Sequence, residues 1–160
     1  PPRSTLFPYT TLFRSDGLMA LWGAPVVHPD DPLRSVQCAL EQMAVLETYN
    51  VERVKKSLPP LAIGIGIHTG PLVAGYLGSS KALSYTVIGD TANTSARLCS
   101  HAAGGQIIVS ETTHARLTGR FESEELPPAT LQGKVKPLRI FNIKAAKVVQ
   151  VPASLDKPEA

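Results

Sequence analysis

Two polar side chains that could act on one ligand lie four residues apart in the stretch YTVIGDTANTSARL, residues 85–98. They are Asn93 and Arg97, and this spacing places both on one face of a helix. A carboxamide beside a guanidinium suits a ligand with a hydroxyl group and a phosphate, because arginine offers several fixed donors to phosphate oxygens. Without further context, such a pair is more often a solvated helix face than a binding site.

Two other polar residues near this stretch are interpreted as structural. His68 follows an apolar strand pattern, and the neighbouring sequence offers it neither a nucleophile nor a metal-ligand cluster. We therefore expect a structural or interface histidine there. Asp90 stands at the start of the predicted helix, where we expect it to cap the helix rather than to bind a metal.

Three helices are predicted to position these residues. Asp31 and Pro32 mark the start of the first, which runs to about Lys56, because aspartate caps a helix and proline suits its first turn. The second covers residues 90–102 and carries the polar pair. Ser110 is expected to cap a short third helix that ends near residue 117.

Seven strands are predicted around these helices. In the second, the small residues Ala62, Gly64 and Gly66 share one face, which implies that another element packs close to the backbone there. Pro127 and Pro128 should end the sixth strand. Strands that alternate with helices and short turns predict an α+β fold, a mixed sheet with helices packed on it. The predicted strands are 18–22, 61–67, 72–77, 84–88, 106–109, 121–126 and 138–143.

The first fifteen residues, PPRSTLFPYTTLFRS, fit neither a targeting signal nor an element of the fold. They lack the apolar run of a secretory signal, and Pro8 interrupts both a helix and a strand. A codon string that begins CCA CCG AGA TCT ACA CTC encodes them in order and looks like a common short-read sequencing adapter. We interpret residues 1–15 as translated adapter that forms no specific part of the fold. The genuine domain would begin at Asp16, with its upstream portion missing.

Composition excludes several classes of protein. The formal net charge of +3 falls to +1 when Arg3 and Arg14 of the first fifteen residues are set aside, so charge is no argument for nucleic-acid binding. The sequence contains no run of eighteen apolar residues, so no membrane span is predicted within it. Cys38 and Cys99 are too few for a disulfide framework, and we expect two core cysteines in a reducing, cytoplasmic compartment.

Four blocks of sequence, taken in order, resemble the class III nucleotidyl cyclase catalytic domain of adenylate and guanylate cyclases. They are DGLMALWGAP, GIGIHTGPLVAGYLGS, YTVIGDTANTSARL and LQGKVKPLRIF, and they span nearly all of residues 16–145. The GIHTG block followed by YTVIGDT-x-N-x-x-x-R-L is a specific signature. The resemblance implies a ferredoxin-like βαβ core, here incomplete at the N-terminus, over residues 16–147. Residues 148–160 would form a flexible tail or linker.

The resemblance also implies a reaction and a partner. The ribose 3′-hydroxyl of ATP attacks the α-phosphate, which releases pyrophosphate and forms cyclic AMP for intracellular signalling. Two Mg²⁺ or Mn²⁺ ions assist, held by two aspartates, since hard cations prefer oxygen ligands. Asp16 matches the second aspartate, and the first would lie upstream of this chain. The family works as a head-to-tail homodimer with shared active sites.

Three more residues match functional positions of the family. Asn93 matches the residue that orients the ribose, and Arg97 the residue that stabilises the transition state. Lys134 matches the lysine that grips the triphosphate, although Lys136 nearby leaves a solvated loop lysine as an open alternative.

One position bears on the choice of purine. Thr86 stands where adenylate cyclases carry an aspartate or threonine that accepts from the adenine amino group, whereas guanylate cyclases usually carry cysteine. Thr86 therefore favours ATP. A second purine-selecting residue, a lysine, would lie four residues before Asp16, where this chain has Leu12.

Alternative functions stay open at this point. The domain could be a guanylate cyclase, or a degenerate cyclase-homology module that binds a nucleotide or a partner and regulates a neighbour. We expect the chain as it stands to be inactive, because the first aspartate and covering elements are missing. The parent could be cytoplasmic or the cytosolic domain of a larger, membrane-anchored protein.

Overall fold

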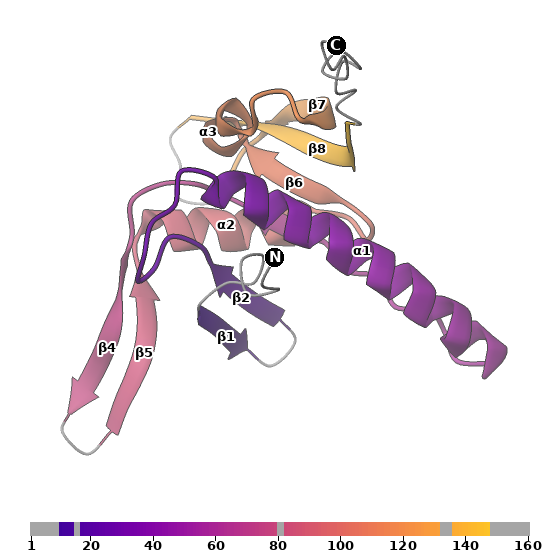
Figure 1. Ribbon diagram of the computed structural model, residues 1–160, viewed down its shortest axis with the longest axis horizontal. Helices are drawn as coiled ribbons and strands as arrows, with labels where there is room; N and C mark the ends of the chain where they lie inside the picture. Colours follow the sequence, from indigo (N-terminus) through magenta and orange to yellow (C-terminus); the bar gives the residue numbers. More distant parts are fainter. Residues whose placement is uncertain (1–9, 15–16, 80–81, 132–135, 148–160) are drawn as a thin grey trace, which may run out of the picture.

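The computed structural model describes residues 10–14, 17–79, 82–131 and 136–147 (Figure 1). The helices are α1 (Asp31–Lys55), α2 (Asp90–His101) and α3 (Glu111–His114), the last followed by the 3₁₀ turn η2 (Ala115–Leu117). The strands are β1 (Thr10–Arg14), β2 (Gly17–Leu21), β3 (Ile65–Ile67), β4 (Val73–Ser79), β5 (Ala82–Ile88), β6 (Ile107–Ser110), β7 (Phe121–Ala129) and β8 (Leu138–Ala146).

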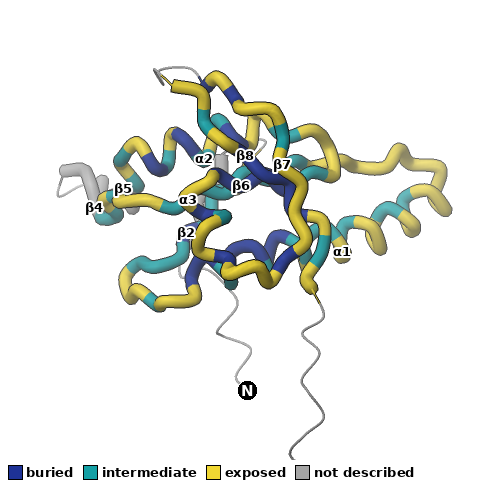
Figure 2. Tube along the Cα trace, turned by 90° about the horizontal axis from the view of Figure 1, so that it is seen from above, coloured by how far each residue is buried: buried dark blue, intermediate teal, exposed yellow. Residues whose placement is uncertain are grey.

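The centre of the molecule is a mixed four-stranded sheet in the order β3-β6-β8-β7. β3 runs parallel to β6, whereas β6–β8 and β8–β7 are antiparallel. Side chains alternate across β6, so that Ile107 and Val109 pack toward α1 while Ile108 packs toward Leu98 of α2. Figure 2 shows the buried stretches of β6 and β8 between the two helices. This confirms the predicted α+β fold.

Two smaller antiparallel ladders stand beside this sheet. β4 and β5 form a hairpin that extends away from the start of α2 (Figure 1). β1 pairs with β2 along its whole length, with Leu12 opposite Met19. The expectation that the first fifteen residues take no part in the fold is therefore wrong for Thr10–Arg14. This stretch has no proline, so its backbone can complete the exposed edge of β2.

The strand predicted over residues 61–67 is shorter than expected, because its first half is bound to α1. The Asn50 side chain donates to the carbonyl of Leu61 and accepts from its N–H, both at 2.7 Å. Arg53 donates from Nε to the carbonyl of Pro59 at 2.8 Å. These bonds occupy the backbone hydrogen-bonding groups of Pro59 and Leu61, and the chain joins the sheet only at Ile65.

The prolines at positions 127 and 128 do not end β7, contrary to expectation. β7 is the edge of the main sheet, where a missing backbone donor is tolerated. The pairing with β8 becomes irregular between Leu126 and Ala129, and β7 continues to Ala129. An irregular edge strand thus accommodates the two prolines.

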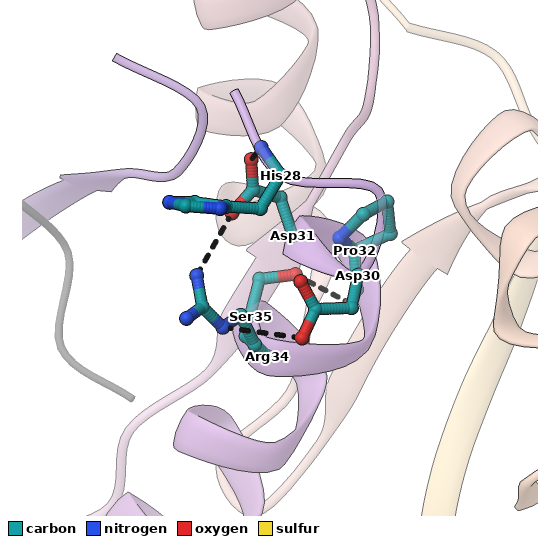
Figure 3. Close-up of polar contacts among 6 residues, drawn as sticks. All are labelled: His28, Asp30, Asp31, Pro32, Arg34 and Ser35. Carbon is teal, nitrogen blue, oxygen red and sulfur yellow. Dashed lines mark hydrogen bonds and ion pairs between the residues drawn. The ribbon is translucent and has the colours of Figure 1, made fainter. Parts of the chain in front are cut away.

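The N-terminus of α1 differs from the predicted cap. Asp30 occupies the cap position without a side-chain cap bond, and Asp31 is the first helical residue. The Asp31 carboxylate accepts from the backbone N–H of His28 at 2.7 Å and so ties the preceding loop to the helix (Figure 3). Within the described residues, none of the helices is both long and apolar enough to cross a membrane.

Candidate active site

The helix that carries Asn93 and Arg97 lies directly on the backbone of β3. A methyl group added at Gly66 would lie 2.7 Å from the carbonyl oxygen of Ser95 and 2.6 Å from the carbonyl carbon of Leu98. One added at Gly64 would lie 2.7 Å from the carbonyl oxygen of Ala102. Glycine is therefore required at both positions, and the predicted close approach to the small-residue face is confirmed.

Side-chain hydrogen bonds fix α2 in the same place. Ser95 donates to the carbonyl of Gly66 at 3.0 Å, and Thr91 donates to the carbonyl of Pro71 at 2.5 Å. Thr94 and Leu98 are fully buried on the inner face of the helix. The helix can therefore neither rotate nor slide without breaking these contacts.

Asn93 and Arg97 lie on the opposite side of α2, away from β3. Asn93 is exposed and Arg97 is partly exposed. Their positions fall on the outer face because the inner face is taken by Thr94, Ser95 and Leu98. In the part of the chain that the structure describes, neither side chain has a hydrogen bond or an ion pair. An anchored helix thus presents an amide and a guanidinium with free donors.

The turn into α2 depends on a glycine. Gly89 has a φ of +149°, and a methyl group added there would lie 3.3 Å from Cα of Leu72. Gly89 is the cap residue and Asp90 is the first helical residue, so the expectation that Asp90 occupies the cap position of α2 is wrong. Thr86 lies in β5, opposite Gly75 of β4 and shortly before this turn. Its side chain is not among those described.

Two of the predicted site residues, Asp16 and Lys134, lie outside the described residues. The described part contains no group of three or more His, Cys, Asp or Glu residues that could hold a metal ion. The metal-binding role expected of Asp16 stays a prediction.

His68 belongs to a network of hydroxyl groups. Its Nδ1 lies 2.7 Å from Oγ of Ser110, which is fully buried. Ser110 Oγ lies 3.2 Å from Oγ1 of Thr113 and accepts from its backbone N–H at 3.4 Å, which confirms the predicted cap of α3. The sequence could not indicate the partner of His68, because the two residues are 42 positions apart.

This network gives a stability prediction. Replacing Ser110 by alanine removes the cap of α3 and leaves His68 and Thr113 with fewer partners, so we expect a loss of about 2 kcal/mol in the free energy of unfolding. Urea denaturation measures it. Ser100→Ala is the matched control, since its exposed hydroxyl donates only to the Ala96 carbonyl. Equal stability of the two variants would show that the network contributes nothing.

The pKa shifts in the described part lie away from α2. Burial raises the pKa of the Cys38 thiol, which stays protonated in the core as expected. Cys99, however, is exposed and not a core residue, because it lies at the side of α2, where its Sγ is 3.4 Å from the Gly64 carbonyl oxygen. The hydrogen bond from Arg139 lowers the pKa of Glu125 in an exposed ion pair.

The fold is that of a nucleotidyl cyclase catalytic domain. The chain belongs to the family described as "Adenylate and Guanylate cyclase catalytic domain", whose profile matches residues 15–145. Solved structures agree: the guanylyl cyclase Cya2 superposes with a TM-score of 0.77 at 34% identity, covering 91% of this chain and 73% of that one. This confirms the resemblance and its ferredoxin-like cyclase core.

Curated relatives include both kinds of cyclase. Adenylate cyclase 1 of Rhizobium meliloti is 30% identical over 133 residues, which are 82% of this chain and 20% of the relative. The membrane guanylyl cyclase of Dictyostelium discoideum is 34% identical over 116 residues, which are 72% of this chain and 7% of the relative. The chain thus spans a fifth or less of the length of these two proteins.

Proposed function

We propose that this domain, in its whole protein, converts ATP to cyclic AMP and pyrophosphate. A bond forms between the ribose 3′-oxygen and the α-phosphorus, the bond from that phosphorus to the bridging oxygen breaks, and the 3′-hydroxyl loses its proton. The observation that carries the proposal is the pair Asn93 and Arg97 on the outer face of a helix that β3 holds in place.

Each side chain has a role that fits its chemistry. Arg97 donates to the phosphate oxygens on which negative charge grows as the α-phosphorus becomes five-coordinate. Asn93 offers both a donor and an acceptor to the ribose, which orients the 3′-hydroxyl. Lys134 contributes a point charge to the triphosphate, and Thr86 accepts from the adenine amino group.

Metal ions and a second protomer complete the proposal. Two Mg²⁺ or Mn²⁺ ions would supply charge neutralisation, with Asp16 as the one proposed ligand in this chain. A head-to-tail homodimer would bring a partner to the open face of α2. Because its substrate is an intracellular nucleotide, we assign the domain to the cytoplasm.

A direct assay tests the proposed reaction. The whole protein that carries this domain, with its own upstream segment, is incubated with Mn²⁺ and either ATP or GTP, and both cyclic nucleotides are quantified. We expect cyclic AMP to exceed cyclic GMP. Predominant cyclic GMP would establish the guanylate cyclase alternative, which the Dictyostelium relative and Cya2 favour. Nucleotide binding without turnover would identify a regulatory module.

Thr86 gives a sharper prediction about the purine. Replacing it by valine keeps the side-chain volume but removes the hydroxyl, so we expect kcat/KM for ATP to fall about tenfold, the value of one good hydrogen bond. Turnover of GTP should stay unchanged. Equal losses with ATP and GTP would mean that Thr86 does not contact the purine.

A further inference from the structure

A cavity of about 270 Å³ lies where the first turns of α1 meet the edge of the main sheet. It is on the face of the sheet that α1 covers, whereas α2 with Asn93 and Arg97 packs on the other face. The proposed reaction makes no use of it. Its lining comes from Leu33, Arg34 and Gln37 of α1 and from Arg120, Phe121, Ala146 and Lys147 at the adjoining ends of β7 and β8.

Two positively charged residues line this cavity just beyond the paired ends of β7 and β8. Phe121 pairs with Ala146 across the ladder, and the backbone N–H of Lys147 donates to the carbonyl of Arg120 at 2.8 Å. Arg120 and Lys147 are therefore opposite each other, and both are exposed. Among the described residues, no carboxylate forms an ion pair with either. Like charges directly opposite on two strands destabilise the pairing.

A third cation lies on the α1 side of the cavity. The Arg34 guanidinium is held between the carboxylates of Asp30 and Asp31, at 3.4 Å from each (Figure 3). Guanidinium carries five N–H donors, so these two contacts leave others available. The two aspartates carry one more negative charge than Arg34 offsets, so the positive charge at the cavity comes from Arg120 and Lys147, and the five groups together carry a net charge of +1.

The inner wall of the cavity is apolar. Phe121 is 8% exposed and belongs to the core beneath α1, and Leu33 packs against the same cluster. A ligand that filled the cavity would cover this apolar surface as well as meet the cations.

We propose that this cavity binds a small organic anion. Its carboxylate or phosphate head lies between Arg120 and Lys147, where it removes their mutual repulsion. Its apolar body lies against Leu33 and Phe121. This ligand class follows from the cavity, because a purely inorganic anion would leave the apolar wall exposed and an uncharged molecule would leave the cations unpaired.

Titration of the ¹⁵N-labelled chain, followed by NMR, tests the proposal. Phenyl phosphate and benzoate are the probes. The one that binds with the lower dissociation constant shows whether the site prefers a phosphate or a carboxylate head. We expect saturable shifts of the backbone amides of Arg120, Phe121, Ala146 and Lys147, with a dissociation constant on the order of 1 mM. Inorganic phosphate has the negative charge but no apolar body, and benzyl alcohol has the apolar ring but no charge. Both should bind at least tenfold more weakly.

Paired charge variants separate a specific site from general attraction to a basic protein. Arg120→Gln with Lys147→Gln should weaken binding about tenfold. Arg116→Gln with Lys56→Gln changes the net charge equally at exposed positions outside the cavity, and should leave binding unchanged. Without ligand, the first double variant should melt no lower than the unmodified chain, since it loses a repulsive pair.

Three results would overturn the proposal. They are equal weakening in the two double variants, inorganic phosphate binding as tightly as phenyl phosphate, and shifts confined to residues around Arg97. The last would assign the probes to α2. If the proposal holds, Arg97→Ala leaves the shifts at the cavity intact.

Discussion

Replacing Arg97 by alanine should lower kcat of the whole protein about 10²- to 10³-fold, while KM for ATP changes much less. The reason is that its guanidinium would meet charge that develops only in the transition state, so its loss raises the barrier rather than the binding free energy of the substrate. Arg97→Lys should recover little of the activity, because an ammonium group lacks the planar fork of donors. Initial rates of cyclic AMP formation, measured over a range of ATP concentrations, provide both constants.

The matched control for this prediction is Arg116→Ala. Arg116 is exposed in η2 and has no ion pair among the described residues, so its loss should leave kcat within twofold. A similar fall in both variants would point to a general effect of charge. If kcat in Arg97→Ala is unchanged and only KM rises, Arg97 binds the substrate but does not stabilise the transition state.

The elements of the fold were predictable where local pattern decides them. Pro32 at the start of α1 and the small-residue face that includes Gly64 and Gly66 each indicate structure within a few residues of sequence. The same local rules failed where contacts between residues far apart in the sequence decide whether a segment joins a sheet. The Asn50 side chain binds the backbone of Leu61 and keeps that residue out of the sheet. Thr10–Arg14 forms a strand because β2 offers an unpaired edge.

The candidate site was predictable only in part, for a similar reason. The spacing of Asn93 and Arg97 predicts a shared helix face, and the structure adds that this face points away from β3. The partnership of His68 with Ser110 spans 42 positions and leaves no mark in local sequence. The cavity near Phe121 arises from the meeting of two strand ends with α1, which periodicity cannot predict.

The second large effect concerns Gly66, where the fold and the site depend on each other. Gly66→Ala would place a methyl group 2.6–2.7 Å from backbone atoms of α2, namely the Leu98 carbonyl carbon and the Ser95 carbonyl oxygen. Backbone cannot yield as a side chain can, so α2 must shift as a unit. We expect a loss of about 3 kcal/mol in the free energy of unfolding, measured by urea denaturation.

Gly75→Ala separates this effect from the general properties of glycine. A methyl group added at Gly75 in β4 would meet nothing within 4 Å, so its unfolding free energy should change by no more than about 0.5 kcal/mol. Since α2 carries Asn93 and Arg97, Gly66→Ala should also abolish cyclisation in the whole protein at temperatures where the variant stays folded. Normal turnover in a folded Gly66→Ala protein would mean that α2 need not rest on β3. The positioning of Asn93 and Arg97 by β3 would then no longer explain the activity.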